Sequence, residues 1–540
     1  MIVDLDAPSG LDPIRVGGKA AALAAARASG VAVLPGFVVE ASASREHMEL
    51  GARTLPERGS GGARLAVTAT PIEFGDRLIT AGAALSERLV ARSSTLLETS
   101  GEWAGAFTSY VDVAPEELPK AVVGCWASAF AVAAMERQEA AGVEPGSFPM
   151  AVLVQPALDP EAGGWAEIGS DGTVTVSGVK GSPAPLLQGW VTGHDGRFDE
   201  GWSGASLIEL VGVDNLNTIK DELTIASAAI GANRCEWALT DRIWALQVGR
   251  VPAPISPPRY TPPGEVDDQV LDVMRLVVAA PGRLGDEMVL PWAIAGAPMT
   301  IADAPLGPDA VDQARQLRRE LTEEVWGRPW EQADPSARRL LARLRGGDFA
   351  LAVGELRRLD PPDPARSSRL VAILRGLRRE MADRGVVPEE AAAWHLGLDE
   401  IEAARRGEMI ALPTRLGIGS WEPLVAHVVL AAVTPRWGTP ASPGTGAGRR
   451  TEIPGPHHPT VGRRGILTAG SPTPNLASLL WDAAGLVTAS GSPAAHLFEA
   501  ARALRVPAVC GVDLGHERDV VVAVDGSTGA VATLPIDLEV

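Results

Sequence analysis

The sequence contains little cysteine, and its cysteines are scattered. Cys125, Cys235 and Cys510 are the only three in 540 residues, and they lie far apart. This spacing excludes a cluster of metal-binding thiolates and the disulfide framework of small secreted proteins. The first residues, MIVDLDAPSG, lack a basic segment followed by an apolar core, so no secretion signal is expected. Together these absences favour a reducing cytoplasm.

Positive charge and long apolar runs are also scarce. The chain carries 48 Lys and Arg against 67 Asp and Glu, a formal net charge of −19 at pH 7. This acidic balance argues against nucleic acid as the main partner, because phosphate binding requires local positive charge. No run of about 18 uncharged apolar residues is present, so no membrane span and no membrane partner are expected.

Aromatic residues are few, with 2 Tyr and 8 Phe, whereas Pro and Gly are frequent and divide the chain. A chain of 540 residues is too long for one compact domain. Residues 251–264 lie in a segment with six prolines, and residues 434–464 combine Pro, Gly and basic residues. Neither composition suits a regular helix or a central strand. Both stretches are therefore predicted to be linkers, the second a flexible one; an ordinary surface loop is the alternative.

These linkers delimit three parts and predict a multidomain α/β (α+β) protein. Residues 1–250 alternate helical and strand-like segments, among them a helix at Ala20–Ser29 and a buried strand in MAVLVQPAL. The middle part, 265–433, is mostly helical, with apolar residues three and four apart. Its clearest helices are DAVDQARQLRRELTEEVW, PSARRLLARLRG and SRLVAILRGLRREMADRG. Residues 465–540 read as strand, helix, strand and a hairpin with Asp525-Gly526 at its turn.

One histidine, His496, stands at the expected start of a helix in TASGSPAAHLFEAARALRVPAVCGV. Ser492 is expected to cap this helix and Pro493 to occupy its first position, which places His496 in the first turn. The helix face expected to pack inward consists of Leu497, Ala500, Ala501 and Leu504. A helix N-terminus offers free N–H groups and partial positive charge, which suit an imidazole that accepts a phosphoryl group. From the residues alone, a surface or partly packed histidine is the alternative.

The residues around His496 resemble a known motif. Thr488, Gly491, His496, Arg502 and the following VPAVCGV are similar to T-x-x-G-G-x-x-[ST]-H-A-A-I-V-A-R-x-x-G-I-P-A-V-x-G. This is the usual pattern of the swivelling phosphohistidine domain of phosphoenolpyruvate-utilizing enzymes. The resemblance implies a β/β/α domain over 465–540 in which His496 carries a phosphoryl group. Thr488 and Arg502 would hold the phosphohistidine.

The chain departs from this pattern beside the histidine. Ser492 replaces the second glycine, Ala495 replaces the hydroxyl residue, and Leu-Phe-Glu follows the histidine. The departures leave two further hypotheses open. The chain could be a non-catalytic, nucleotide-binding homologue, or a phosphohistidine subunit that works with a separate acceptor protein.

A second match lies near the beginning of the chain. RVGGKAAALAAARASGVAVLPGFVVEA, residues 15–41, resembles the opening of the same family's ATP-grasp domain. Gly17 and Gly18 would let the backbone approach a phosphate, and Lys19 adds a point charge. A simple turn is the alternative for these residues taken alone.

The segment LVARSSTLLETSGEWAGAFTSYVDV also resembles that domain. The resemblance implies that Arg92 grips phosphate oxygens with its planar donor fork and that Ser93 donates to phosphate. Glu98 matches an acidic position of the family, and Ala106 stands where the family has a glutamine. Gln155, in MAVLVQPAL, stands where the family has a nucleotide-contacting glutamine.

The segment CEWALTDRIWALQVGR reads as a hairpin. If Asp241-Arg242 form its turn, Glu236 and Gln247 lie directly opposite each other on one face. Carboxylate and amide oxygens are hard ligands that suit a Mg²⁺ bridging the phosphates of ATP, and the family has the same pairing. An ordinary edge-strand acid is the alternative for Glu236. Arg250, implied to contact the nucleotide, stands one residue further along than in the family pattern.

The order of the parts resembles rifampin phosphotransferase, whose acceptor region lies between the ATP-grasp and histidine domains. Related dikinases continue with a (β/α)₈ barrel, for which the roughly 30 residues after Val512 leave no room. The resemblance implies an ATP- and Mg²⁺-dependent phosphotransferase that uses phospho-His496, releases AMP and phosphate, and acts on a small hydroxylated acceptor. No catalytic role is assigned to His395 or His427 of the middle part or to His457-His458.

Overall fold

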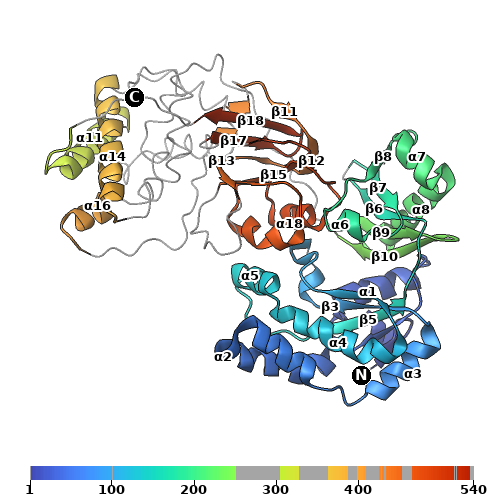
Figure 1. Ribbon diagram of the computed structural model, residues 1–540. Helices are drawn as coiled ribbons and strands as arrows, with labels where there is room; N and C mark the ends of the chain where they lie inside the picture. The colour runs from blue at the N-terminus through green and yellow to red at the C-terminus, as the bar shows by residue number, and fades with distance from the viewer. Residues whose placement is uncertain are drawn as a thin grey trace. The chain divides into compact units, whose positions relative to one another are not determined.

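The computed structural model describes residues 2–99, 101–169, 171–250, 305–326, 363–386, 398–408, 425–426, 429–430, 433–452, 465–515, 517 and 520–535. The chain forms two compact units, which are described separately (Figure 1). Unit 1 comprises Met1–Pro254, Gly470–Trp481 and Ser490–Arg505. Unit 2 comprises Ile255–Ala469, Asp482–Ala489 and Val506–Val540.

The first sheet of unit 1 has five antiparallel strands in the order β1-β2-β5-β3-β4. Its strands are β1 (Ile2–Asp4), β2 (Phe37–Val39), β3 (Leu89–Ser94), β4 (Ser109–Val113) and β5 (Ala151–Pro156). Its helices are α1 (Pro13–Ala28), α2 (Arg45–Ala69), α3 (Gly75–Leu85), α4 (Leu118–Ala127) and α5 (Val132–Ala140). The central strand β5 is buried over Ala151–Gln155, which explains its unbroken apolar run. The predicted helix at 20–29 and the buried strand in MAVLVQPAL are thus confirmed.

The second sheet of unit 1 has five antiparallel strands in the order β10-β9-β6-β7-β8. Its strands are β6 (Ala162–Ile168), β7 (Val174–Lys180), β8 (His194–Phe198), β9 (Arg234–Leu239) and β10 (Ile243–Gly249). Its helices are α6 (Ala184–Leu187), α7 (Ala205–Val211) and α8 (Val213–Ile230). One apolar core contains Leu23 of α1, Leu153 of β5 and Trp237 of β9, so α1 packs where the two sheets meet.

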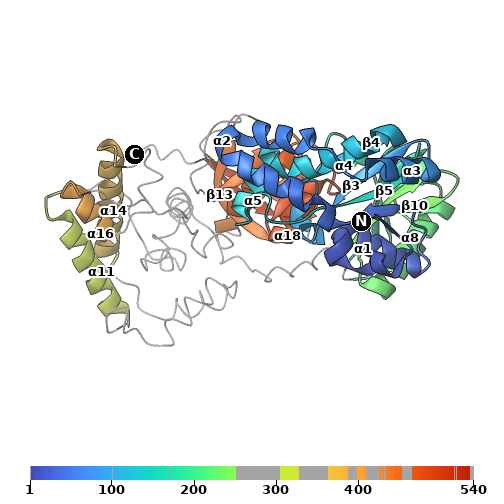
Figure 2. The same ribbon diagram turned by 90° about the horizontal axis from the view of Figure 1, so that it is seen from below.

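Unit 1 also contains short 3₁₀ helices and the helix that begins at His496. The 3₁₀ helices are η1 (Pro8–Leu11), η2 (Ala41–Ser44), η3 (Leu97–Thr99), η4 (Gly101–Trp103), η5 (Pro115–Glu117), η6 (Ser128–Phe130) and most of η9 (Pro474–Asp482). The helix is α18 (His496–Leu504). Figure 2 shows the helices of the first sheet, α2 and α4 among them, from a second side.

The middle part is helical where the structure describes it. Its helices are α11 (Ala310–Trp326), α14 (Pro364–Asp383) and α16 (Leu398–Arg405). They share an apolar core that includes Leu317, Leu374 and Ile401, as their three- and four-residue spacing predicts. The helix predicted in PSARRLLARLRG, the 251–264 linker and the histidines at 395, 427, 457 and 458 lie outside the described residues.

Unit 2 contains an eight-stranded sheet in the order β11-β18-β17-β13-β14-β15-β16-β12. Its strands are β11 (Arg436–Trp437), β12 (Thr439–Ser442), β13 (Thr445–Glu452), β14 (Ile466–Ala469), β15 (Gly485–Thr488), β16 (Ala508–Cys510), β17 (Val520–Asp525) and β18 (Ala530–Pro535). Strands β13 to β16 pair in parallel, and the other pairs are antiparallel. The predicted hairpin is confirmed: the Asp525 carboxylate accepts from the amides of Ser527 and Thr528 in its turn.

The flexible linker predicted at 434–464 is wrong for residues 436–452, which form β11, β12 and β13. The proline and glycine residues that suggested a linker instead occupy positions in the strands that suit them. Pro440 lies on the edge strand β12, where a missing N–H costs least. A Cβ on Gly446 would lie 2.0 Å from the carbonyl oxygen of Ala484, so this central strand needs glycine there. Each of these residues meets a tertiary requirement that composition alone does not reveal.

Within the part of the chain that the structure describes, no single helix is long and apolar enough to cross a membrane. The bent pair Pro115–Phe130 and Val132–Ala140 meets that requirement only when its members are counted together. Its apolar side chains, such as Val122 and Trp126, belong to the core beside the first sheet.

Candidate functional site

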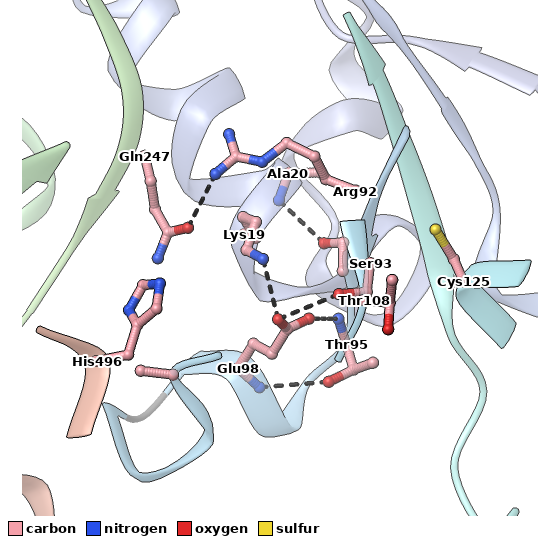
Figure 3. Close-up of polar contacts among 12 residues, drawn as sticks. Lys19, Ala20, Arg92, Ser93, Thr95, Glu98, Thr108, Cys125, Gln247 and His496 are labelled. Atoms are coloured by element: carbon pink, nitrogen blue, oxygen red, sulfur yellow. Dashed lines mark hydrogen bonds and ion pairs between the residues drawn. The ribbon is translucent and has the colours of Figure 1, made fainter. Parts of the chain in front are cut away.

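Arg92 joins the two sheets of unit 1. Its guanidinium extends from β3 and donates to the carbonyl oxygen of Leu246 and, at 3.3 Å, to Oε1 of Gln247 on β10. It also lies 3.7 Å from Oε2 of Glu236 on β9, and both side chains are largely buried. The structure therefore brings three of the predicted residues together at one seam. Figure 3 shows the contact of Arg92 with Gln247.

Glu236 and Gln247 lie opposite each other, as predicted, but the hairpin reaches this register differently. Its turn is longer than the predicted Asp241-Arg242, because Leu239 pairs with Ile243. The register shifts before Gln247, which leaves Leu246 as an extra residue on β10. This bulge restores the pairing of Glu236 with Gln247. The carbonyl oxygen of the extra residue, Leu246, accepts from Arg92.

Lys19 forms a buried ion pair with Glu98. Its Nζ lies 2.9 Å from Oε1 of Glu98, and the two side chains are only 10% and 8% exposed. The Glu98 carboxylate also accepts from the Thr95 amide at 3.1 Å and from the Ser93 hydroxyl at 3.4 Å. Glu98 thus fixes the loop after β3 and holds the Lys19 cation beside Ser93 (Figure 3).

The two glycines before Lys19 allow α1 to approach that loop. Gly17 has φ +76°, and a Cβ there would lie 2.2 Å from the carbonyl oxygen of Ser94. The Gly18 amide donates to the carbonyl oxygen of Thr95 at 3.0 Å. Both glycines are therefore explained by the close packing that places Lys19 beside Glu98.

Two predicted nucleotide contacts lie apart from this cluster. Gln155 is 3% exposed, and its Nε2 donates to the carbonyl oxygen of Leu34 at 3.0 Å. Arg250 follows the end of β10 with an exposed side chain. Neither is among the described partners of Arg92 or Lys19.

Helix α18 begins at His496, so the histidine lies in the first turn as predicted. The positions predicted for Ser492 and Pro493 are wrong, because the N-cap is Ala495, the first helical residue is His496, and no side chain caps the helix. The Ser492 carbonyl accepts from the Ala495 amide at 3.0 Å, which closes a turn before the helix starts. The Ser492 hydroxyl lies 3.2 Å from that of Ser177 on β7. Leu504, expected on the buried face, is only partly buried.

His496 lies against the loop that follows η4. A Cβ on Gly105, which has φ +65°, would lie 3.1 Å from Cδ2 of His496, so the ring packs closely against this glycine. The side chain is 13% exposed. Figure 3 shows the imidazole pointing toward the amide of Gln247. The predicted phosphoryl carrier and the Arg92 cluster thus both lie within unit 1.

Glu499 and Arg234 are site residues that the sequence did not identify. Glu499 lies on the first turn of α18 with Oε2 at 3.4 Å from Nδ1 of His496, and it forms an ion pair with Arg234 of β9. Burial alone would raise the pKa of Glu499, but Arg234 and the hydrogen bond to His496 lower it to about 2. The available signal was a carboxylate in an otherwise apolar helix face, since buried acids require partners.

Arg137 is a second residue that sequence reasoning missed. Its side chain is buried, and its guanidinium donates to the carbonyl oxygen of Ala104 at 2.8 Å and to that of Pro474 at 2.7 Å. Burial lowers the pKa of this guanidinium to about 10. Arg137 ties the Gly105 loop to η9 and so supports the surface on which His496 rests.

Thr488 and Arg502, the other predicted catalytic residues, have structural contacts of their own. Thr488 ends β15, is fully buried, and accepts from the Val512 amide at 3.0 Å through its carbonyl. Arg502 of α18 donates to the carbonyl oxygen of Pro493 at 3.1 Å. Its guanidinium lies 5.9 Å from the centre of the Trp165 ring. Their roles toward a phosphohistidine stay predictions.

Two side-chain oxygens at the seam are of the kind that Mg²⁺ prefers. Among the described residues, no group of three or more His, Cys, Asp and Glu side chains is placed to hold a metal ion. Glu236, however, is buried, and its Oε1 has no described hydrogen-bond partner. This carboxylate oxygen and Oε1 of Gln247 suit a cation whose other ligands are phosphate oxygens.

Comparison with known families gives an independent indication. Residues 461–529 match the family described as PEP-utilising enzyme, mobile domain. The matched segment contains β14 to β16, α18 and His496. The match supports a relationship to PEP-utilising enzymes and indicates an enzyme family that transfers phosphoryl groups through phosphohistidine. No curated protein matches the chain.

Proposed function

We propose that the protein is an ATP-dependent phosphotransferase of the rifampin phosphotransferase type. It would carry a phosphoryl group on His496 from ATP to a small hydroxylated acceptor and release AMP and inorganic phosphate. The observation that carries this proposal is the position of His496, which lies against Gly105 and points toward the seam with Arg92, Gln247 and Lys19.

Lys19 and Arg92 supply the positive charge for the phosphates of ATP. Lys19 pairs with Glu98, and Arg92 contacts oxygen atoms of Leu246, Gln247 and Glu236. Phosphate oxygens replace these acceptors when ATP binds, because guanidinium and ammonium groups bond strongly to phosphate. Glu236 and Gln247 would hold Mg²⁺, which neutralises phosphate charge.

The first transfer makes His496 a covalent carrier. A ring nitrogen of His496 forms a P–N bond to the β-phosphorus as the P–O bond to AMP breaks, which leaves a pyrophosphoryl group on the ring. Water then attacks the γ-phosphorus, the P–O bond between the γ- and β-phosphoryl groups breaks, and inorganic phosphate leaves with the oxygen of the water. Lys19 and Arg92 stabilise the charge on the transferring group. The carrier splits one difficult transfer into two easier ones.

The second transfer regenerates the histidine. The acceptor hydroxyl oxygen forms a P–O bond, the P–N bond breaks, and the hydroxyl proton leaves to the ring nitrogen. We assign acceptor binding to residues 265–433, which lie between the two predicted domains in the sequence. A separate acceptor protein is the alternative arrangement.

Labelled nucleotide tests the first transfer. The full chain is incubated with Mg²⁺ and ATP labelled at the β or γ phosphate, and acid-labile, base-stable label on the protein is measured. We expect β label on the wild type and none on His496→Ala. The matched control is His194→Ala, since His194 is an exposed histidine of β8.

Two outcomes contradict the proposal. Label that persists in His496→Ala places the acceptor residue elsewhere. Bound ATP without label in any variant supports a nucleotide-binding protein without turnover, in which the internal partners of Lys19 and Arg92 are permanent.

A further inference from the structure

A buried carboxylate lies on the helix turn that begins with His496. Glu499 is three residues after His496, so both side chains lie on the same face of α18. Glu499 is 8% exposed. The family motif has an apolar residue at this position, so the carboxylate is a feature of this chain.

Arg234 fixes the Glu499 carboxylate in place. The ion pair joins the first residue of β9 to the first turn of α18, and the Arg234 side chain is only 4% exposed. Its guanidinium lies 5.8 Å from the centre of the Trp165 ring, which supports it from β6. The Glu499 carboxylate is therefore paired with a side chain of strand β9 and is largely shielded from water.

The same carboxylate oxygen serves the imidazole. Oε2 of Glu499 forms the ion pair with Arg234 and lies 3.4 Å from Nδ1 of His496. Because the pKa of Glu499 is lowered to about 2, the group is ionised at neutral pH and can only accept hydrogen bonds. A neutral imidazole satisfies such an acceptor only by carrying its proton on Nδ1.

We propose that Glu499, held by Arg234, is a positioning residue that keeps the proton of His496 on Nδ1 and directs phosphorylation to Nε2. This inference rests on the proposed function. In the first transfer, the lone pair on Nε2 forms the P–N bond, and the positive charge that develops on the ring is compensated by Glu499 through Nδ1–H. In this proposal Glu499 acts through His496 and is assigned no contact with ATP or the phosphoryl group.

The tautomer is measured directly by ¹⁵N NMR of the full chain labelled in histidine, without nucleotide. His496→Ala identifies the signals of His496 among those of the 8 histidines. We expect a protonated Nδ1 and an unprotonated Nε2 in the wild type. In Glu499→Gln the amide can donate or accept, so we expect both tautomers.

A double variant separates positioning from folding. Glu499→Leu alone would leave the buried Arg234 unpaired and destabilise the fold. Glu499→Leu with Arg234→Met removes both charges and keeps an apolar contact, so the protein should fold while the Nδ1–H tautomer is lost. Glu209→Gln, an exposed acid of α7, is the matched control and should match the wild type.

The reaction gives a second readout. We expect the rate of β label transfer to His496 to fall about 10- to 100-fold in the Glu499 variants, with unchanged ATP binding. Antibodies that separate the two phosphohistidine isomers should detect only the Nε2 isomer in the wild type. In the double variant part of the product should be the Nδ1 isomer.

The outcomes for this inference and for the proposed function are distinct. If wild-type protein takes no label, the proposed function fails, while the NMR result still decides the role of Glu499. If the double variant folds and keeps both the wild-type tautomer and the wild-type labelling rate, Glu499 is only a docking contact and the inference is overturned.

Discussion

The side chains beside His496 make contacts that the usual residues of the phosphohistidine motif could not make. A glycine in place of Ser492 has no hydroxyl to reach Ser177. An apolar residue in place of Glu499 has no carboxylate for Arg234. Ala495, which replaces a hydroxyl residue, is fully buried at the N-cap, where it needs no polar partner. The departures are therefore specific features of this site, and they do not by themselves indicate lost activity.

Glu499 makes stability depend on pH in a defined direction. Its pKa falls from an ordinary 4.5 to about 2 in the folded protein, so its ionised form stabilises the fold above pH 4.5. That contribution is lost as the pH falls from 4.5 toward 2. We expect the difference in unfolding free energy between the wild type and Glu499→Gln to shrink over this range in urea titrations. A difference that stays constant with pH would contradict the lowered pKa of Glu499. For the control Glu209→Gln, we expect no pH-dependent difference in unfolding free energy from the wild type.

At the scale of elements, the β9-β10 hairpin positions side chains around Arg92, and strand β13 holds together the sheet of unit 2. The extra residue at Leu246 lets one hairpin present Glu236, Gln247 and a backbone carbonyl toward Arg92. Strand β13 pairs in parallel with β14 and antiparallel with β17. It joins the parallel and antiparallel halves of the sheet in unit 2, which a flexible linker could not do.

Proline substitution distinguishes a central strand from a linker. Ala447 is 3% exposed within β13 and lies opposite Ala523 of β17. Ala447→Pro should destabilise this sheet by about 3 kcal/mol, because proline fixes φ and removes an N–H from a central strand. Hydrogen exchange of residues 520–525 measures the loss of protection, and Ala447→Ser, which keeps the amide, is the control. Equal protection in the two variants would show that β13 is not part of the sheet core.

At the scale of the whole molecule, the proposed cycle has two separable halves. The segments Gly470–Trp481 and Ser490–Arg505, which contain His496, belong to the unit that holds Lys19 and Arg92. Under the proposed function, this arrangement would let His496 receive a phosphoryl group, and delivery to an acceptor would be a separate step.

This separation predicts a burst of AMP. Without an acceptor, the wild type mixed with Mg²⁺ and ATP should form a single AMP per chain and then stop, because the phosphoryl group stays on His496. AMP and ADP are measured by chromatography after rapid quenching. His496→Ala should give no burst. Formation of ADP in place of AMP would show that a different phosphate is transferred.

The local sequence was sufficient to predict elements whose signals lie within a few residues. The apolar run around Leu153 predicted the buried strand β5, and the spacing of apolar residues predicted α11 and α14. The first-turn position of His496 was predicted correctly, although the residues assigned to the cap and to the first helical position were not. Family resemblance then grouped Lys19, Arg92, Glu236 and Gln247, and the structure brings the last three into direct contact.

What the sequence by itself determined is the elements with strong local signals, among them β5, α11 and α14, because periodicity and turn chemistry are local. Resemblance to a family motif, and not the local pattern alone, singled out His496. Only the tertiary structure decided three other features: the bulge at Leu246, the ion pair of Arg234 with Glu499, and the strands formed by residues 436–452. Each depends on segments distant in the chain, whose approach is set by burial of apolar surface and by the pairing of buried charges. No local pattern encodes which segment will provide the partner.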